Sequence, residues 1–285
     1  MNEILDGLPN MIAGQVWLAG AGPGDPGLLS LLTLKGLRQA DVVVYDALVT
    51  PEILNMAGEG ARLDFAGKRG GLPSHRQQDI SEHLVRLARE GKKILRLKGG
   101  DPLVFGRGGE EARHLVENEI PFRIIPGITA GVGGLAYAGI PLTDRHTNSA
   151  VTFLTGHGAD GGLAKDIDWE ALAKSSPVVV IYMALSRIEL IAEKFLSSGR
   201  PADEPVAIIS KATTPEQKVV VTTLAKCAED VKREHIQAPA MIVVGEVVRL
   251  REGLDWLGAL AGRKLSADVS GIRPQGSRLL KRRDA

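Results

Sequence analysis

The chain has 285 residues, enough for one large domain or two of ordinary size, and its 44% hydrophobic and 24% charged residues are typical of a soluble globular protein. The net charge of +1 argues against a general attraction to nucleic acid or acidic membrane, and the single cysteine, Cys227, excludes an intramolecular disulfide and a thiolate-rich metal site. Because no apolar run could span a membrane, no signal peptide is recognisable and the histidines lack metal-ligand spacing, we expect a cytoplasmic protein without a metal ion.

Strand-like and helix-like segments alternate along the first half of the chain. Residues 1–13 form a leader without a repeating pattern. The expected strands that follow are 16–19, 41–45, 62–65, 93–97 and 122–125, and the expected helices include 28–39 and 77–90. This alternation predicts a mostly parallel sheet with helices on its faces.

The second half repeats the pattern after an interruption. Residues 126–149 are rich in Gly, Thr and Pro, and strand-like runs resume at 151–155, 178–182, 206–209, 218–223 and 240–244. The last two runs lack a long helix of the earlier kind, so we expect the second sheet to be mixed or partly antiparallel. The sequence therefore predicts two α/β domains, 14–140 and 141–262, with a ligand site between them. The basic tail, 263–285, is interpreted as disordered and solubilising rather than as a nucleic-acid-binding segment.

A glycine-rich loop follows the first expected strand. Its sequence, A-G-A-G-P-G-D-P-G, contains Gly22, Gly24 and Gly27 in the dinucleotide-binding pattern G-x-G-x-x-G. Asp46 lies about twenty residues further on, where that pattern has an acid. One hypothesis is therefore a nicotinamide-dependent oxidoreductase.

Three residues of the same loop argue against a bound pyrophosphate. Pro23 and Pro26 remove N–H donors, and Asp25 adds a negative charge where the phosphates would lie. Asp25 is better explained as a helix N-cap with Pro26 at the first helical position. We therefore favour a ligand without phosphate, with a tight turn that feeds a helix as the alternative.

The segment 92–111, K-K-I-L-R-L-K-G-G-D-P-L-V-F-G-R-G-G-E-E, is the most informative part of the chain. An apolar strand leads into a glycine-rich loop, and ligands of α/β proteins bind at such strand ends. Glycines allow a backbone to approach a ligand closely, while Lys98 and Arg107 supply positive charge. The segment predicts a ligand held largely by backbone groups, with an anionic partner nearby.

Several motifs, in order and at matching spacing, resemble the uroporphyrinogen-III C-methyltransferases, a family of tetrapyrrole methyltransferases. They are G-A-G-P-G-D, V-V-V-Y-D-A-L-V, A-G-K-R, the R-L-K-G-G-D-P-L-V-F-G-R-G-G-E-E segment, P-G-I-T-A and G-I-P-L-T-D-R, and the resemblance covers about residues 15–258. It implies a two-domain α/β fold with S-adenosylmethionine in the cleft between the domains, and a homodimer. It also implies methylation of uroporphyrinogen III at C2 and C7, which gives precorrin-2 for sirohaem or cobalamin synthesis.

The resemblance also assigns cofactor contacts to positions of this chain. They are Pro23, Gly99, Gly100, Asp101, Val104, Thr129, Ala130, Met183 and Ala212. Asp101 would face the ribose or the methionine amine, whereas its residue type alone also fits an Asp–Pro turn. Met183 alone reads as a core methionine, and Ala212 stands where relatives often have glycine.

The catalytic residues implied by the same motifs are Asp46, Lys68 and Arg107. Asp46 would be the base and Lys68 the proton donor; from the sequence alone a loop-capping aspartate and a surface lysine are the alternatives. Arg107 would bind carboxylates of the substrate. Weaker candidates for that role are Arg69, Arg96, Arg145 and His146, and Arg96 could instead form an ion pair at a sheet edge or between domains.

Three rival hypotheses stay open at this point. The first is a methyltransferase of a later corrinoid intermediate, and the second is the nicotinamide-dependent oxidoreductase. The third is a tetrapyrrole-binding protein without catalytic activity. The F-G-R-G-G-E-E part of segment 92–111 argues against the first of these, and ligand binding and the effect of changing Asp46 distinguish the other two.

Overall fold

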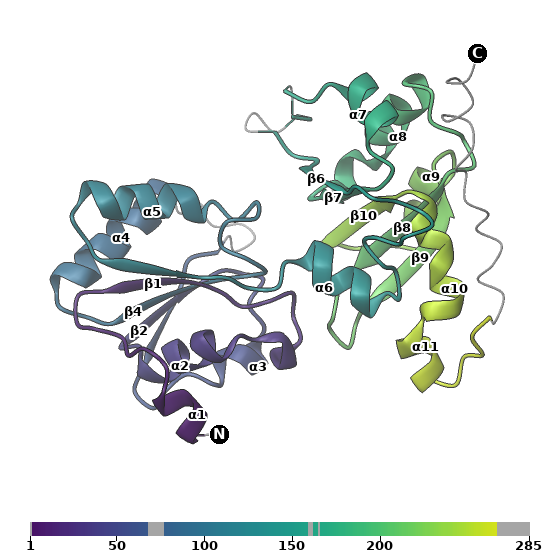
Figure 1. Ribbon diagram of the computed structural model, residues 1–285. Helices are drawn as coiled ribbons and strands as arrows, with labels where there is room; N and C mark the ends of the chain where they lie inside the picture. Colours follow the sequence, from purple (N-terminus) through teal and green to yellow (C-terminus); the bar gives the residue numbers. More distant parts are fainter. Residues whose placement is uncertain (1, 68–76, 159–161, 165, 267–285) are drawn as a thin grey trace, which may run out of the picture. The chain divides into compact units, whose positions relative to one another are not determined.

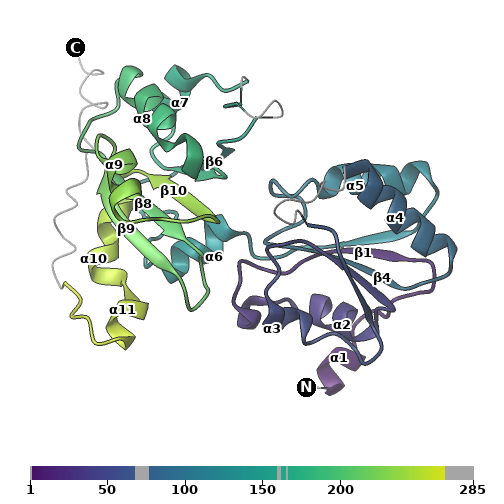
Figure 2. The same cartoon turned by 180° about the vertical axis from the view of Figure 1, so that it is seen from behind.

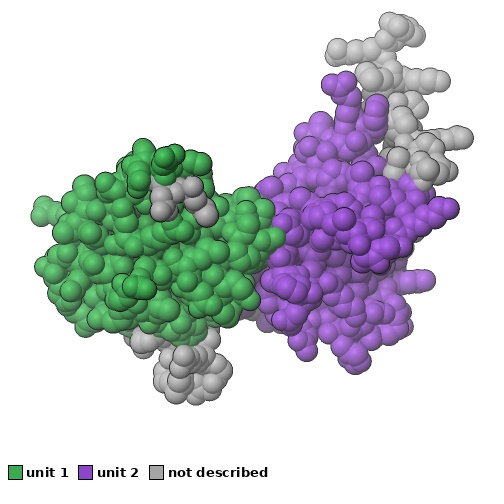
Figure 3. Space-filling model, turned by 90° about the horizontal axis from the view of Figure 1, so that it is seen from below, with its two compact units in different colours: residues 1–130 green, residues 131–285 purple. Residues whose placement is uncertain are grey.

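The computed structural model describes residues 2–67, 77–158, 162–164 and 166–266. The chain divides into two compact units, Met1–Ala130 and Gly131–Ala285, shown in different colours in Figure 3. The division falls at the first residue of helix α6 (Ala130–Tyr137). The sequence expectation placed the domain boundary later, after residue 140.

The first unit is built on a five-stranded sheet in which every pair of neighbours is parallel. Its strands are β1 (Val16–Gly20), β2 (Val42–Tyr45), β3 (Arg62–Phe65), β4 (Ile94–Lys98) and β5 (Phe122–Ile125), in the order β3-β2-β4-β1-β5. Both central strands, β1 and β4, are buried throughout. Because the strands are parallel, their carboxyl ends and the loops that follow share one edge of the sheet. The expected parallel sheet is confirmed.

Helices cover both faces of this sheet, α4 and α5 on one face and α2 and α3 on the other (Figure 1, and from behind in Figure 2). They are α2 (Leu31–Gln39), α3 (Pro51–Leu54), α4 (Gln77–Arg89) and α5 (Gly108–Glu117). Successive side chains of a strand point to opposite faces. Trp17 therefore packs with Leu37 of α2, while its neighbour Leu18 packs with Leu84 of α4.

The N-terminal leader belongs to the first unit. Helix α1 (Asn2–Asp6) is held by Lys35, whose Nζ donates to the carbonyls of Leu5 at 2.6 Å and Leu8 at 2.5 Å. Met11 is buried in the core on the α2 side of the sheet. This packing was not predictable from the sequence, because a five-residue helix is too short to show a helical period.

The second unit has a mixed five-stranded sheet. Its strands are β6 (Thr152–Thr155), β7 (Val179–Tyr182), β8 (Pro205–Ser210), β9 (Lys218–Thr223) and β10 (Ala240–Val244), in the order β6-β7-β10-β8-β9. Only β6 and β7 pair in parallel, since β10 is antiparallel to both its neighbours and β8 is antiparallel to β9. The expectation of a mixed sheet is confirmed.

Short helices surround the second sheet. They are α7 (Trp169–Ser175), α8 (Ile188–Ser197), α9 (Cys227–Arg233), α10 (Arg251–Leu254) and α11 (Trp256–Leu260), with single 3₁₀ turns at Leu185–Arg187 and Glu246–Leu250. Phe195 of α8 packs in the core against Ile181 and Ile208 of the sheet. None of the helices in the described part of the chain is long and apolar enough to cross a membrane.

Helix α6 packs closely against the second sheet through its glycines. A Cβ atom on Gly131 would clash with the Tyr182 hydroxyl, and one on Gly134 would lie 2.8 Å from the Ala212 Cβ. The Gly131 N–H donates a hydrogen bond to that hydroxyl at 2.7 Å. At the other end of the helix, Trp256 Nε1 donates to the Ala136 carbonyl at 2.9 Å. Small residues thus bring α6 up to the ends of β7 and β8.

Candidate active site at the strand ends

Loops that follow two central strands of the first unit are joined by a pair of backbone hydrogen bonds. The Gly22 N–H donates to the Gly100 carbonyl at 3.2 Å, and the Gly100 N–H donates to the Gly22 carbonyl at 2.7 Å. Gly22 and Gly100 both have positive φ, 75° and 67°, which glycine adopts without the strain of a side chain. The two glycine-rich segments singled out in the sequence are therefore neighbours.

The loop after β5 packs against the same point. A Cβ atom on Gly20 would lie 2.5 Å from the Gly127 Cα, and one on Gly127 would clash with the Gly100 carbonyl. Asp101 fastens this contact, because its Oδ2 accepts from the Gly127 N–H at 3.0 Å and its Oδ1 from the Leu103 N–H at 2.8 Å. The Asp101 carboxylate thus holds backbone amides, and its contact with a cofactor stays a prediction.

All residues assigned to the cofactor lie just after strand ends. In the first unit they follow β1, β4 and β5: Pro23, Gly99, Gly100, Asp101, Val104, Thr129 and Ala130. In the second unit, Met183 follows β7 directly and Ala212 lies shortly after β8. Met183 is 52% exposed with φ of 53°, so it is not a core methionine. Ala212 is buried, and its Cβ lies against Gly134 of α6.

Asp46 directly follows β2 and lies beside two cations from β4. Its Oδ1 lies 2.6 Å from an Arg96 guanidinium nitrogen, and its Oδ2 lies 3.6 Å from Lys98 Nζ. Arg96 and Lys98 are two residues apart on one strand, so they point to the same face. Their side chains are 1% and 4% exposed, whereas that of Asp46 is 26% exposed. Asp46 is thus the solvent-accessible end of a buried charge cluster.

Glu111 of α5 completes this cluster. Its Oε1 lies 3.1 Å from Arg96 Nε and 3.1 Å from Lys98 Nζ, and it accepts a hydrogen bond from Gln77 of α4 at 2.9 Å. The sequence interpretation treated Glu111 only as an acid in the first turn of a helix. The sequence indicated its role only indirectly, because two cations on one face of a buried strand need buried anionic partners.

This cluster changes the roles expected for both cations. Arg96 was expected to bind substrate, but its guanidinium is buried and bonded to Asp46, Glu111 and the Val44 carbonyl at 3.3 Å. The ion-pair alternative describes it better, although the pair lies on a central strand within one unit. Lys98 was expected to face an anionic ligand, and it is likewise buried between the two carboxylates.

Arg107 lies at the N-cap position of α5 and is exposed. Its backbone has φ of 59°, and its side chain is 56% exposed. The guanidinium donates to both carboxylate oxygens of Glu110, at 2.9 and 2.7 Å. These bonds hold the pKa of Glu110 below its usual value, although partial burial opposes the shift. An exposed pair exchanges partners at little cost, so Arg107 can bind another carboxylate.

The other cationic candidates are three residues expected to bind substrate, Arg69, Arg145 and His146, and the expected proton donor Lys68. Arg145 and His146 are exposed in the second unit, in the loop before β6. Lys68 and Arg69 lie outside the described residues. All four stay predictions.

Asp25 caps the turn after the first glycine loop. Its Oδ1 accepts from the Gly27 N–H at 2.7 Å, and Pro26 begins the 3₁₀ turn Pro26–Leu28. Helix α2 starts afterwards and has its own cap, since the Ser30 hydroxyl accepts from the Thr33 N–H at 3.1 Å. A carboxylate thus occupies the place where the nicotinamide hypothesis needs a pyrophosphate, and the capping interpretation is confirmed.

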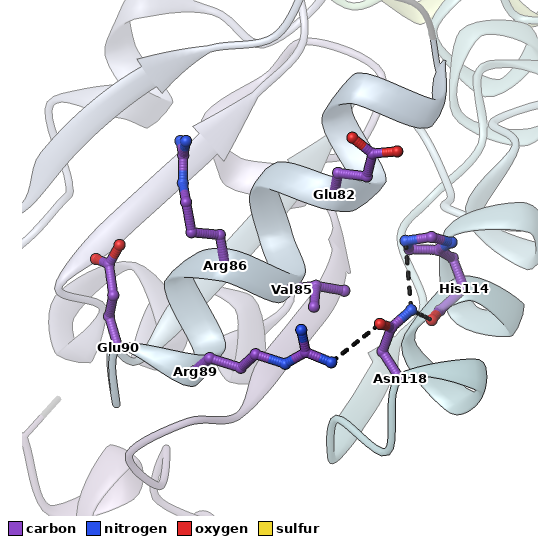
Figure 4. A pocket seen from close by; sticks show the side chains of 7 residues that line it. All are labelled: Glu82, Val85, Arg86, Arg89, Glu90, His114 and Asn118. Atoms are coloured by element: carbon purple, nitrogen blue, oxygen red, sulfur yellow. Dashed lines mark hydrogen bonds between the residues drawn. The ribbon is translucent and has the colours of Figure 1, made fainter.

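A groove of about 540 Å³ lies elsewhere on the first unit, between α4 and α5 (Figure 4). Arg89 of α4 donates to the Asn118 amide oxygen across it, at 3.1 Å. The lining residues are Glu82, Val85, Arg86, Arg89, Glu90, His114 and Asn118. None of them was a candidate, and the groove holds charges of both signs.

Comparison with known proteins gives a consistent result. The family profile of the tetrapyrrole (corrin/porphyrin) methylases matches residues 15–228. A uroporphyrinogen-III C-methyltransferase of Sinorhizobium sp. is 59% identical over 268 residues, which is 94% of this chain and 96% of that protein. A siroheme synthase of Azotobacter vinelandii is 49% identical over 85% of this chain, and this chain spans about half of its length, 52%.

Solved structures show the same similarity. A crystal structure of a uroporphyrin-III C-methyltransferase from Thermus thermophilus, complexed with S-adenosylhomocysteine, matches with a TM-score of 0.72 and 36% identity over 83% of this chain and 99% of that one. A cobalt-precorrin-4 methyltransferase matches with a TM-score of 0.74 and 27% identity over 82% of this chain and 96% of that one.

Proposed function

The chain belongs to the tetrapyrrole methylase family, and we propose that it transfers methyl groups from S-adenosylmethionine to C2 and C7 of uroporphyrinogen III. The product would be precorrin-2, a precursor of sirohaem and cobalamin. The observation that carries this proposal is the 59% identity to a uroporphyrinogen-III C-methyltransferase over almost the full length of both chains.

The glycine-lined loops fit a cofactor held by backbone groups. Gly20 and Gly127 pack so closely against each other and against the Gly100 carbonyl that neither could carry a side chain, and Gly99 would clash with Leu48 if it carried a Cβ. This arrangement leaves main-chain atoms at the strand ends, where α/β proteins bind ligands. With the nine residues assigned above, these loops would hold S-adenosylmethionine or its product.

The chain's own residues would then align the substrate and accept a proton. When bound, S-adenosylmethionine supplies a methyl group that its sulfonium has already activated. The protein must therefore position the pyrrole carbon and exclude water. The Asp46 carboxylate, accessible at the end of β2, would stabilise the cationic methylated ring and remove its proton. Lys68 would donate a proton as the ring tautomerises while a further ring proton leaves to solvent, so that each methyl transfer releases one proton overall.

Arg107 would hold carboxylate side chains of the substrate. A guanidinium binds a carboxylate through two parallel hydrogen bonds, as Arg107 already does with Glu110. Arg69 and Arg145 would add further positive charge around the ring. Arg96 is not part of this proposal, because its guanidinium is used within the buried cluster.

The direct test is anaerobic incubation of the purified protein with uroporphyrinogen III and S-adenosylmethionine. We expect S-adenosylhomocysteine to form together with products that carry one and then two additional methyl groups, which mass spectrometry identifies. Asp46→Asn should abolish most of this turnover while the circular dichroism spectrum stays unchanged. A protein that binds S-adenosylhomocysteine but leaves uroporphyrinogen III unmethylated would refute the proposed substrate.

The similarity to a cobalt-precorrin-4 methyltransferase supports one alternative, a later corrinoid substrate. The lower identity, 27% against 59%, favours uroporphyrinogen III. Parallel assays with both substrates decide between them. Calorimetry with NADH addresses the oxidoreductase hypothesis, for which we expect no binding because Asp25 and two prolines occupy the glycine loop.

We also propose that the active form is a homodimer in the cytoplasm. The proposal follows from the resemblance to the methyltransferase family. Sedimentation equilibrium should give about twice the chain mass of 30.3 kDa. A monomer that is fully active would contradict it.

A further inference from the structure

The buried cluster raises a question about the charge around Asp46. Arg96 and Lys98 both contact its carboxylate, and water does not screen them because their side chains are 1% and 4% exposed. A base that faces two uncompensated buried cations is held in its charged form and accepts a proton poorly. Glu111 lies behind both cations, at 3.1 Å from each.

We propose that Glu111 is a positioning residue for Asp46, which fixes Arg96 and Lys98 and cancels one of their two positive charges. Asp46 then faces a net charge of one cation. The inference rests on the proposed function, in which Asp46 takes the proton from the methylated ring. Glu111 itself is fully buried, so it acts through the two cations and not on the substrate.

The hydrogen bonds of Glu111 support this role over helix capping. Its Oε1 accepts hydrogen bonds from Arg96, Lys98 and the Gln77 amide. Its Oε2 is buried and has no hydrogen-bond partner among the described residues. A carboxylate that capped α5 would instead accept backbone N–H groups. The side chain therefore serves the cations.

Few other charged groups in the described part of the chain contact this assembly. From β2 the Val44 carbonyl accepts from Arg96, and from α4 the neutral Gln77 amide binds Glu111. The charged groups in contact with Asp46 are thus Arg96 and Lys98, with Glu111 behind them, while Glu110 acts on Lys98 and Arg107 on Glu111 at longer range. Changing Glu111 or Lys98 alters this balance in opposite directions.

The test compares Glu111→Gln, Lys98→Met and the double variant, with Glu117→Gln as the control on the same helix. Glu117 is 71% exposed, so its variant should behave as wild type. We expect Glu111→Gln to lower kcat about 10- to 100-fold, part of the roughly 10²- to 10⁴-fold that a general base contributes. The acidic limb of its pH–rate profile should move to lower pH, and that of Lys98→Met to higher pH.

The double variant separates charge compensation from packing. It has one cation fewer and one anion fewer, so Asp46 again faces a net charge of one cation. We therefore expect its kcat to exceed that of Glu111→Gln by about fivefold or more. If Glu111→Gln acted by disturbing the packing instead, the second substitution would lower kcat further. Calorimetry should give the same affinity for S-adenosylhomocysteine in all variants, since the cluster lies outside the glycine contacts.

Two results would overturn the inference while leaving the proposed function intact. One is a folded Glu111→Gln protein with wild-type kcat and pH profile. The other is a double variant that is no more active than Glu111→Gln. If Glu111→Gln alone does not fold, the other two variants provide the test. The acidic limb of the pH–rate profile should move to higher pH in Lys98→Met and return to its wild-type position in the double variant. A wild-type protein that does not methylate uroporphyrinogen III refutes both proposals.

Discussion

Arg107 shows how a single backbone conformation can leave a candidate side chain exposed at the start of a helix. Its left-handed conformation, φ of 59°, ends the glycine-rich loop and starts α5 with the side chain exposed. Non-glycine residues rarely adopt this conformation, and they do so more often at functional sites. The solvent-exposed ion pair with Glu110 orients the guanidinium and leaves it able to bind another carboxylate.

We expect Arg107→Ala to lower kcat/KM about tenfold or more, because a charged hydrogen-bonded pair contributes roughly 1.5–3 kcal/mol. The effect should fall mainly on KM for uroporphyrinogen III, while the affinity for S-adenosylhomocysteine stays unchanged. Arg113→Ala is the matched control, since Arg113 is exposed on the same helix. Equal losses in both variants would show that only the overall positive charge matters.

The sequence placed the candidate residues at strand and loop ends but did not show their contacts. Asp46 and Arg107 were assigned from the motifs of the family resemblance, and their roles stay predictions. The sequence left substrate binding and an ion pair both open for Arg96, because burial of a cation depends on a partner far away in the sequence, here Glu111. A local pattern shows which residues follow a strand, but not which distant charges neutralise one another.

At the scale of elements, glycines join the loops that form the site. Gly20, Gly100 and Gly127 come from three different strand ends, and their backbones touch. The parallel strands were predictable from apolar runs, and the mixed second sheet from its missing helices. The glycine contacts were not predictable from the sequence, since they depend on the strand order β3-β2-β4-β1-β5. This order places the ends of β4 and β5 on either side of β1.

We expect Gly127→Ala to destabilise the first unit by about 1–3 kcal/mol, because a Cβ there clashes with the Gly100 carbonyl. The affinity for S-adenosylhomocysteine should fall as well, since the displaced loops carry several of its proposed contacts. Gly109→Ala is the control: a Cβ there meets nothing within 4 Å, and alanine favours a helix. Urea unfolding and calorimetry measure both effects, and a Gly127→Ala protein with wild-type affinity would exclude the loops from the cofactor site.

At the scale of the whole molecule, two units with separate cores share the proposed cofactor residues. Each unit buries its own sheet, with Trp17 and Leu18 on opposite faces of the first and Phe195 against the second. Seven of the nine assigned residues fall in the first unit, while Met183 and Ala212 fall in the second. A ligand that uses all of them must affect both units, although neither core depends on it.

Hydrogen–deuterium exchange with S-adenosylhomocysteine tests this division. We expect slower exchange at residues 21–24, 99–104 and 127–130 of the first unit, and also at 183–184 and 211–213 of the second. At a ligand concentration of 100 times Kd, binding adds about 2.7 kcal/mol to the free energy of unfolding. NADH should protect neither set, because the Asp25 cap occupies the first glycine loop. If S-adenosylhomocysteine slowed exchange in one unit alone, the residues of the other unit would not belong to the proposed site. If NADH slowed exchange at residues 22–27, the oxidoreductase hypothesis would be restored.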